Sequence, residues 1–307
     1  MTSRGKPWSR ICLVLALTCA ITVRAAVPTA ARSPKATPTP PPLPIQTATT
    51  HPMKYYLSLP KNWSAKRKWP VLVAPSAHYG DKGATLRMFA RERDARMAEF
   101  IVVQPFVINA DPMAKMAEYR GEVADAIRAA DAATDGRDEI ARGKFDREGV
   151  MAVIRDVQTL YQGETKVYLA GFSSSTHIAT MFVFAHPELI KGAVINSGGY
   201  AGRGVDEEHI PLVNSPERAR MEIKVIVGEE DRGYQFYSEN WAETKAKLLG
   251  YGHRPEKLQM EVINKGNPEK LSPGHGWYAG RIMDFILEVE QKSRTGNTHD
   301  EQRENAR

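Results

Sequence analysis

Short apolar runs alternate with amphipathic segments through the middle of the chain. Seven of these runs predict β-strands, at residues 53–59, 69–75, 100–106, 166–172, 192–198, 222–228 and 259–265. Several are continuously apolar, which is typical of strands buried on both faces of a sheet. The segments between them predict helices, and the clearest, residues 147–161, repeats its apolar side chains along one helical face. The alternation predicts an α/β fold with a mostly parallel central sheet and helices on both faces.

The first 25 residues have the pattern of a secretory signal peptide. Three basic residues precede an apolar run at residues 11–23, and Ala25 is a small residue at a cleavage position. We therefore expect a secreted protein, or one of the periplasm or cell envelope, whose mature chain has no stable membrane span. An uncleaved anchor is the alternative. Cys12 and Cys19 both lie in this segment, so the mature chain would have no disulfide.

Composition divides the rest of the chain into three parts. Residues 26–52 are rich in Pro and Thr and predict an extended linker. Residues 53–290 carry the apolar pattern and predict the folded domain, in which the long Ala- and charge-rich stretch 111–144 suggests a helical insertion near the site. Residues 291–307 are polar without apolar periodicity and predict a disordered tail.

Charge narrows the possible partners. The chain has 42 Lys and Arg against 36 Asp and Glu, and removing the four basic residues of the first 25 positions leaves 38 against 36. There is no basic stripe with interleaved aromatic residues, so we expect no nucleic-acid partner. No motif calls for a metal or an organic cofactor, and the oligomeric state is open.

Three serines follow the predicted strand at 166–172. A nucleophile elbow has the pattern G-x-S-x-G, because the turn is sharp and tolerates only small residues two positions before and after the serine. Gly171 lies two positions before Ser173, and Ser175 stands where the second glycine is expected. Ser173 is therefore the candidate nucleophile. The alternative is that the three serines only cap the following helix.

The base and the acid of such a site follow the serine along the chain. His275 lies in a Gly-rich loop after the last predicted strand and is the favoured base, ahead of His253 in a turn-like stretch. Asp231 closely follows the strand at 222–228 and is the favoured acid, with Glu229 or Glu230 as possible substitutes. Such a carboxylate would orient the imidazole and stabilise its cationic form.

Four further residues complete the list of candidates. Asp206, in a polar loop, is the other aspartate between Ser173 and His275. The oxyanion hole needs two backbone N–H groups, and we expect one from Ser174, directly after the nucleophile. The second would come from Ala77, in the loop after the strand at 69–75, with His78 beside it.

These stretches resemble the α/β-hydrolase superfamily from about Lys54 to Val289, and most of all its secreted polyhydroxybutyrate depolymerase and feruloyl esterase group. Residues 55–80 resemble the opening strands and the "HGGG"-like loop of that group, and residues 153–199 resemble its helix, "GFSxGG" elbow and following strand. "VGEED" (227–231) and "PGHGW" (273–277) resemble its acid turn and histidine loop. The resemblance implies an α/β-hydrolase fold and the triad Ser173, Asp231 and His275.

The expected activity is cleavage of small-molecule or polymeric carboxylic esters by an exported serine hydrolase. Two departures from the family pattern matter. The "HGGG" loop is replaced by residues 75–79, PSAHY, and the glycines after the elbow serine are replaced by Ser175 and Thr176. These changes keep two alternatives open: a serine peptidase of the prolyl-oligopeptidase type, and a catalytically inactive envelope or carbohydrate-binding protein.

Overall fold

The computed structural model describes residues 43–76, 81–108, 125, 138–199 and 213–304. The expected signal peptide, residues 26–42 of the expected linker and most of the stretch 111–144 lie outside the described residues. Only the end of that stretch, residues 138–144, is described, apart from Asp125, and it forms the first turns of a helix.

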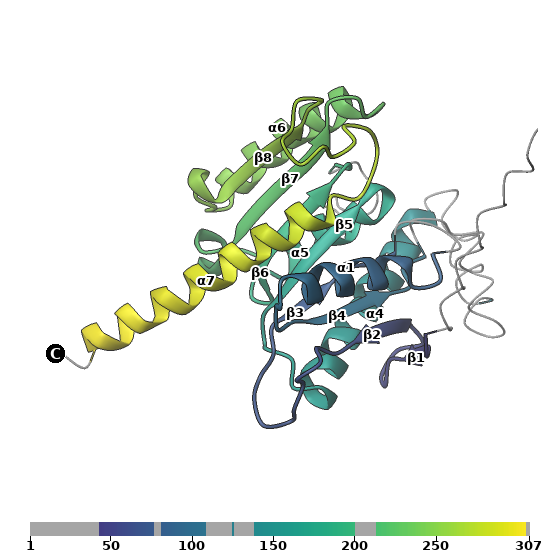
Figure 1. The fold of residues 1–307 in the computed structure, drawn as a ribbon, viewed down its shortest axis with the longest axis vertical. Coiled ribbons are helices and arrows are strands. Elements are labelled where there is room, and N and C mark those ends of the chain that lie inside the picture. Colours follow the sequence, from purple (N-terminus) through teal and green to yellow (C-terminus); the bar gives the residue numbers. More distant parts are fainter. Residues whose placement is uncertain (1–42, 77–80, 109–124, 126–137, 200–212, 305–307) are drawn as a thin grey trace, which may run out of the picture. The chain divides into compact units, whose positions relative to one another are not determined.

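An eight-stranded sheet forms the centre of the described chain (Figure 1). Its order is β1-β2-β4-β3-β5-β6-β7-β8. Strand β2 is antiparallel to β1 and β4, and all the other neighbours are parallel. The strands are β1 (Gln46–Thr47), β2 (Lys54–Ser58), β3 (Val71–Val73), β4 (Ile101–Pro105), β5 (Val167–Phe172), β6 (Ile190–Asn196), β7 (Glu222–Gly228) and β8 (Leu258–Ile263). All seven predicted strands are present, and β1 is an addition.

Helices cover both faces of this sheet. Helices α1 (Ala84–Ala95) and α7 (Ala279–Glu304) pack together across one face, in front of the sheet in Figure 1. Helices α4 (Asp138–Leu160) and α5 (Thr176–Ala185) pack together on the other face, and α6 (Tyr234–Gly250) packs against β7. The predicted α/β class, with a mostly parallel sheet between two helical layers, is confirmed.

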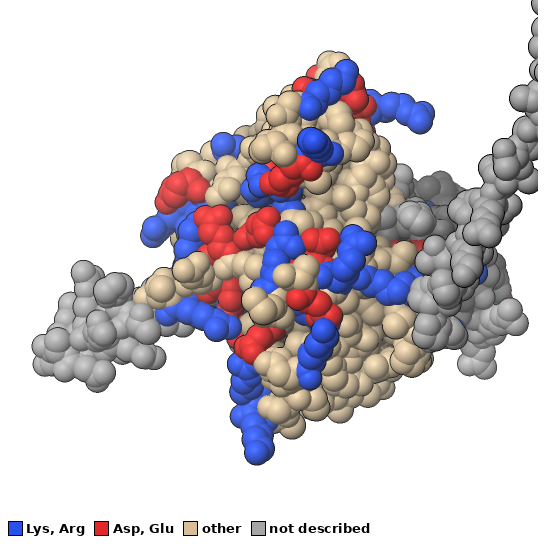
Figure 2. All heavy atoms as spheres, viewed as in Figure 1, with Lys and Arg blue, Asp and Glu red and all other residues tan. Residues whose placement is uncertain are grey.

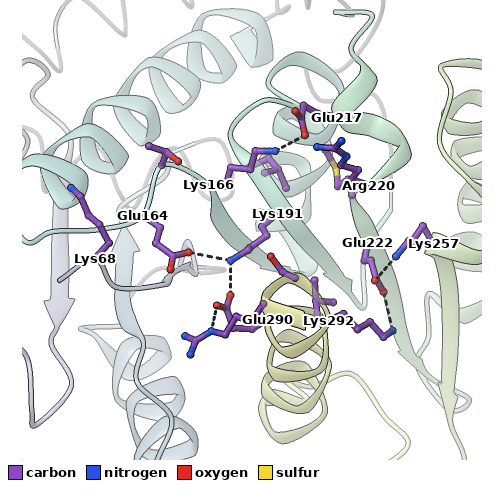
Figure 3. Close-up of a pocket in the computed structure, with 16 residues that line it drawn as sticks. Lys68, Glu164, Lys166, Lys191, Glu217, Arg220, Glu222, Lys257, Glu290 and Lys292 are labelled. Carbon is purple, nitrogen blue, oxygen red and sulfur yellow. Dashed lines mark hydrogen bonds and ion pairs between the residues drawn. The ribbon is translucent and has the colours of Figure 1, made fainter. Parts of the chain in front are cut away.

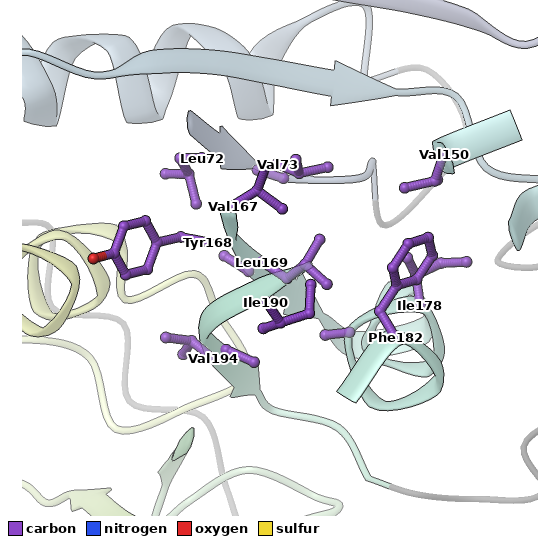
Figure 4. Packing of buried hydrophobic residues seen from close by; sticks show 14 of the residues in the cluster. Leu72, Val73, Val150, Val167, Tyr168, Leu169, Ile178, Phe182, Ile190 and Val194 are labelled. Atoms are coloured by element: carbon purple, nitrogen blue, oxygen red, sulfur yellow. The ribbon is translucent and has the colours of Figure 1, made fainter. Parts of the chain in front are cut away.

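The core explains why β5 is continuously apolar. All six residues of β5 are buried, and successive side chains of a strand point to opposite faces. Figure 4 shows Tyr168 pointing toward α7, while Leu169 points to the other side, where Ile178 and Phe182 of α5 lie. Both faces therefore need apolar side chains, and burying each contributes roughly 1.5–3 kcal/mol.

The two ends of the folded domain differ from the sequence prediction. The linker was expected to run to residue 52, but β1 pairs with β2, and Thr49 donates two hydrogen bonds to the buried Asp156 carboxylate of α4. At the other end, α7 continues to Glu304, where a disordered tail was expected from Gln291. This last part lacks apolar periodicity because it has no sheet to cover, and ion pairs such as Lys292–Glu288 and Arg294–Glu290 support its start.

Within the described residues, no helix combines the length and the apolar character that crossing a membrane requires.

Candidate active site

Ser173 lies at the point where β5 turns into α5. It begins a short 3₁₀ turn (Ser173–Ser175), and its φ is +51°, a left-handed conformation that is unusual for a residue with a side chain. Such a conformation costs on the order of 1–3 kcal/mol and is typical of functional sites. Gly171 makes the sharp turn possible, because a Cβ there would lie 2.6 Å from Thr176 Cα. The predicted elbow geometry is therefore present at Ser173.

Ser175 replaces the second glycine of the elbow without reaching solvent. It is fully buried, and its hydroxyl accepts a hydrogen bond from Phe172 N–H at 3.1 Å. The hydroxyl has one proton to donate, and its Oγ lies 3.0 Å from Phe172 O and 3.3 Å from Pro75 O. The hydroxyl therefore bonds back to the end of β5 and toward the loop after β3, and it does not cap α5.

The structure brings Asp231 and His275 together. Asp231 follows β7, its side chain is 2% exposed, and its Oδ2 lies 2.8 Å from His275 Nδ1. The other oxygen, Oδ1, accepts a hydrogen bond from Gly233 N–H at 2.9 Å. A carboxylate only accepts, so this contact places the proton of a neutral imidazole on Nδ1 and leaves Nε2 as the basic atom.

Phe172 links this pair to the elbow. Its ring lies 4.8 Å from the His275 ring and 4.9 Å from the Trp277 ring, centroid to centroid. Because Phe172 directly precedes Ser173, the imidazole lies beside the turn that carries the serine. Within the described part of the chain the Ser173 hydroxyl has no hydrogen-bond partner, and such contacts are often long in unliganded sites.

Asn196, at the end of β6, is hydrogen-bonded to the loop that carries His275. Its buried amide accepts a hydrogen bond from Tyr278 N–H at 3.0 Å and donates one to Gly276 O at 3.2 Å. The Tyr278 hydroxyl reaches Gly274 O at 2.6 Å, and burial, with the Asp231 charge, raises the pKa of Tyr278 to about 12. The loop on either side of His275 is thus tied down by neutral donors. Sequence reasoning missed Asn196, whose only signal was its place at a strand end.

His177, one helical turn after Ser173, was also missed. It is buried, its Nδ1 contacts Ser174 O, and its Nε2 lies 3.5 Å from the buried Asp146 carboxylate of α4. Asp146 in turn accepts a hydrogen bond from Ile108 N–H at 2.8 Å. This second His–Asp pair links the elbow to α4. The four-residue spacing from Ser173 was the signal that could have revealed it.

The other predicted candidates lie at the surface, in the interior, at the elbow or outside the described residues. Glu229 and Glu230 contact Lys265 at the surface, Glu229 through the backbone N–H and Glu230 through an ion pair. His253 is buried just after α6, with its Nδ1 at 3.1 Å from Leu248 O, and the structure does not bring it to Ser173 or Asp231. Ser174 lies at the elbow as expected. Asp206, Ala77 and His78 lie outside the described residues.

Two hollows differ in position and character. A hollow of about 720 Å³ lies at the amino ends of β5, β6 and β7, opposite the end where Ser173, Asp231 and His275 lie. Figure 3 shows its lysines and glutamates paired with one another, for example Lys166 with Glu217 and Lys191 with Glu290. A smaller hollow, of about 200 Å³, lies at the elbow and is lined by Ser173, Ser174, Thr176, His177, Gly198, Gly199, Phe236 and Tyr237. The larger hollow is therefore not the one that contains the candidate nucleophile.

The arrangement has the parts that acyl transfer requires. Within the described ranges no cluster of three or more His, Cys, Asp or Glu side chains could hold a metal ion. A strained serine, a histidine oriented by a buried carboxylate and backbone N–H groups at a helix start are the parts that nucleophilic catalysis needs.

Comparison with known proteins supports the fold. No protein-family model matches the sequence, and a search of the curated proteins finds no match. Among solved structures, the S-formylglutathione hydrolase of Staphylococcus aureus matches with a TM-score of 0.52 and 14% identity, over 80% of this chain and 94% of that one. A ferulic acid esterase matches with a TM-score of 0.50 and 13% identity, over 80% of this chain and 95% of that one.

A thermostable esterase also matches, with a TM-score of 0.48 and 18% identity, over 80% of this chain. The chain spans only 61% of the length of that esterase. With the strand order and the helical layers described above, the structural likeness establishes the α/β-hydrolase fold for this chain.

Proposed function

We propose that the protein is an exported serine hydrolase that cleaves carboxylic esters through an acyl-enzyme. The observation that carries the proposal is the 2.8 Å contact of Asp231 with His275 beside the left-handed Ser173. The signal-peptide pattern of residues 1–25 supports export to the cell envelope or beyond.

The proposed mechanism has two steps. His275 Nε2 takes the proton of Ser173 Oγ as the serine attacks the ester carbonyl carbon, and Asp231 stabilises the resulting imidazolium. The oxyanion is held by Ser174 N–H and a second N–H from the loop after β3, where Ala77 is the candidate. The imidazolium then protonates the leaving alcohol. In the second step a water, deprotonated by His275, hydrolyses the acyl-enzyme and frees the acid.

For the substrate we propose an ester like those cleaved by the polyhydroxybutyrate depolymerase and feruloyl esterase group. The motif resemblance supports this class, and one structural neighbour is named a ferulic acid esterase. The small hollow at the elbow, with Phe236 and Tyr237 on its wall, suits a compact acyl or aryl group.

The test is labelling of the purified mature chain with a fluorophosphonate probe, together with turnover of short alkyl and aryl esters. Ser173→Ala is expected to abolish both, with an unchanged melting temperature. Ser174→Ala is the matched control, because it removes the neighbouring hydroxyl but keeps the backbone N–H, and it should retain most of the activity.

Three outcomes would overturn the proposal. Undiminished ester turnover by Ser173→Ala would exclude this serine as the nucleophile. A folded wild-type chain that neither labels nor turns over esters would favour a catalytically inactive binding protein. Cleavage of peptide but not ester substrates would favour a prolyl-oligopeptidase-like peptidase.

A further inference from the structure

Thr176 occupies a position where the family pattern has glycine, and its hydroxyl makes a hydrogen bond that glycine could not make. It is the first residue of α5, it is 3% exposed, and its Oγ1 donates a hydrogen bond to Ser173 O at 2.7 Å. The backbone N–H of Thr176 points to the same carbonyl. The carbonyl of the candidate nucleophile is therefore held by both donors of one residue.

That carbonyl shares a peptide plane with the N–H of Ser174. In a planar trans peptide the C=O and the following N–H point in opposite directions, so fixing one fixes the other. Ser174 N–H is the group expected to hold the oxyanion. The Thr176 hydroxyl thus acts on the direction of that N–H through the Ser173 carbonyl.

Gly198, after β6, leaves room for this arrangement. A Cβ at Gly198 would collide with the Thr176 side chain and come within 2.8 Å of Ser173 O. The hydroxyl, the carbonyl and the glycine therefore fit together as one packed unit. The last glycine of the G-x-S-x-G-G pattern has no side chain and leaves the backbone free. Thr176 restricts the backbone at this position and adds a hydrogen bond to Ser173 O.

We propose that Thr176 is a positioning residue that aims the Ser174 N–H at the developing oxyanion. The inference rests on the proposed hydrolase function. An N–H contributes to catalysis only when it already points to where the charge develops, and losing one such donor outright costs about 10²–10³ in kcat. Removing the Thr176 hydroxyl loosens the donor but leaves it in place, so the expected fall in kcat is smaller, about tenfold.

The experiment compares Thr176→Val, Thr176→Ser and Thr180→Val in the mature chain. Thr176→Val keeps the shape and loses the hydroxyl, and Thr176→Ser keeps the hydroxyl. Thr180 is the matched control, because it is buried in the same helix one turn later and its Oγ1 donates to Thr176 O at 3.0 Å. The measurements are kcat and KM on a short aryl ester, the rate of fluorophosphonate labelling, and the melting temperature.

We expect Thr176→Val to lower kcat and the labelling rate about tenfold with KM within about twofold, by the oxyanion argument. Thr176→Ser should recover most of the loss, and Thr180→Val should keep the wild-type kcat. If Thr176→Val does not fold, Thr176→Ala gives the same reading without the added methyl. A wild-type kcat in the Thr176 variant, an equal loss in Thr180→Val, or no recovery with serine would overturn the inference while the wild type still labels. An unlabelled, inactive wild type would instead overturn the proposed function.

Discussion

The contact between Asp231 and His275 can be tested by replacing one carboxylate oxygen of Asp231. Asp231→Asn keeps the size of the side chain but gives it an N–H₂ group, which can turn the imidazole so that Nε2 carries the proton and no longer acts as a base. Under the proposed mechanism kcat falls by about 10³–10⁴-fold while the melting temperature changes little. The measurement is steady-state turnover of a short aryl ester.

Glu230→Gln is the control for this change. Glu230 lies one residue earlier, is 46% exposed and pairs with Lys265 at the surface, where ion pairs contribute little. It should keep kcat within about twofold. Equal losses in the two variants would mean that general negative charge near His275, and not the Asp231 contact, supports activity.

His253 makes stability depend on pH. Burial, together with the charge of Arg218, lowers the pKa of His253 to about 4, against 6.5 in an unfolded chain. Between these values the unfolded chain binds more protons, so the free energy of unfolding should fall as the pH drops from 6.5 toward 4. At about 1.4 kcal/mol per pKa unit the loss from this one group approaches about 3 kcal/mol.

Urea unfolding of wild type and His253→Gln at several pH values tests this. Glutamine keeps a donor for Leu248 O but does not titrate, so the variant should be less stable at pH 7 yet show a shallower loss below pH 6.5. Identical slopes for the two chains would show that another group causes the acid sensitivity.

The loop that carries His275 depends on an element far from it in sequence. Asn196 of β6 bonds to Gly276 O and Tyr278 N–H, on either side of Trp277 and directly after the histidine. Asn196→Ala takes the partner from the buried Tyr278 N–H and from the half-buried Gly276 carbonyl, which costs about 1–3 kcal/mol of stability. It should also lower kcat, by about tenfold or more, because the imidazole loses its fixed direction. Melting and ester turnover are measured together.

Asn267→Ala separates the two effects. Asn267 ties its own loop in a similar way, accepting from Leu271 N–H and donating to Leu271 O, both at 2.8 Å. It should cost stability and leave kcat near the wild-type value. If both variants lose stability and neither loses kcat, the Asn196 contacts are structural only.

The strands could be predicted because a strand buried on both faces has to be continuously apolar. The elbow could be predicted because Gly171 is the residue that its backbone demands. The same logic could not find β1, whose two residues lie in a Pro- and Thr-rich stretch and join the sheet by pairing with β2. Nor could it find Asn196, Thr176 or His177, because a polar residue reveals its role only when the fold shows which carbonyl or carboxylate it meets.

The surface charge of the described residues bears on how the protein meets a charged partner. On the face drawn in Figure 2, basic and acidic side chains are mixed. One chain of ion pairs runs from Lys224 of β7 through Glu261 of β8 and Arg281 of α7 to Glu269. Such a surface gives little long-range steering toward a charged partner. We therefore expect ester turnover to change little with ionic strength, in keeping with recognition inside the small hollow at the elbow.

The boundary of the folded domain gives a prediction of its own. A chain beginning at residue 53, the boundary that composition suggests, lacks β1 and leaves the buried Asp156 without its Thr49 donors. It should be less stable than a chain beginning at residue 43 by about 2–4 kcal/mol, since an unpartnered buried polar group alone costs about 1–3 kcal/mol. Thr49→Val in the longer chain removes one of the two donors and should cost about 1 kcal/mol. Urea unfolding measures all three. Equal stability of the two truncated chains would mean that residues 43–52 only lie against a domain that is complete without them.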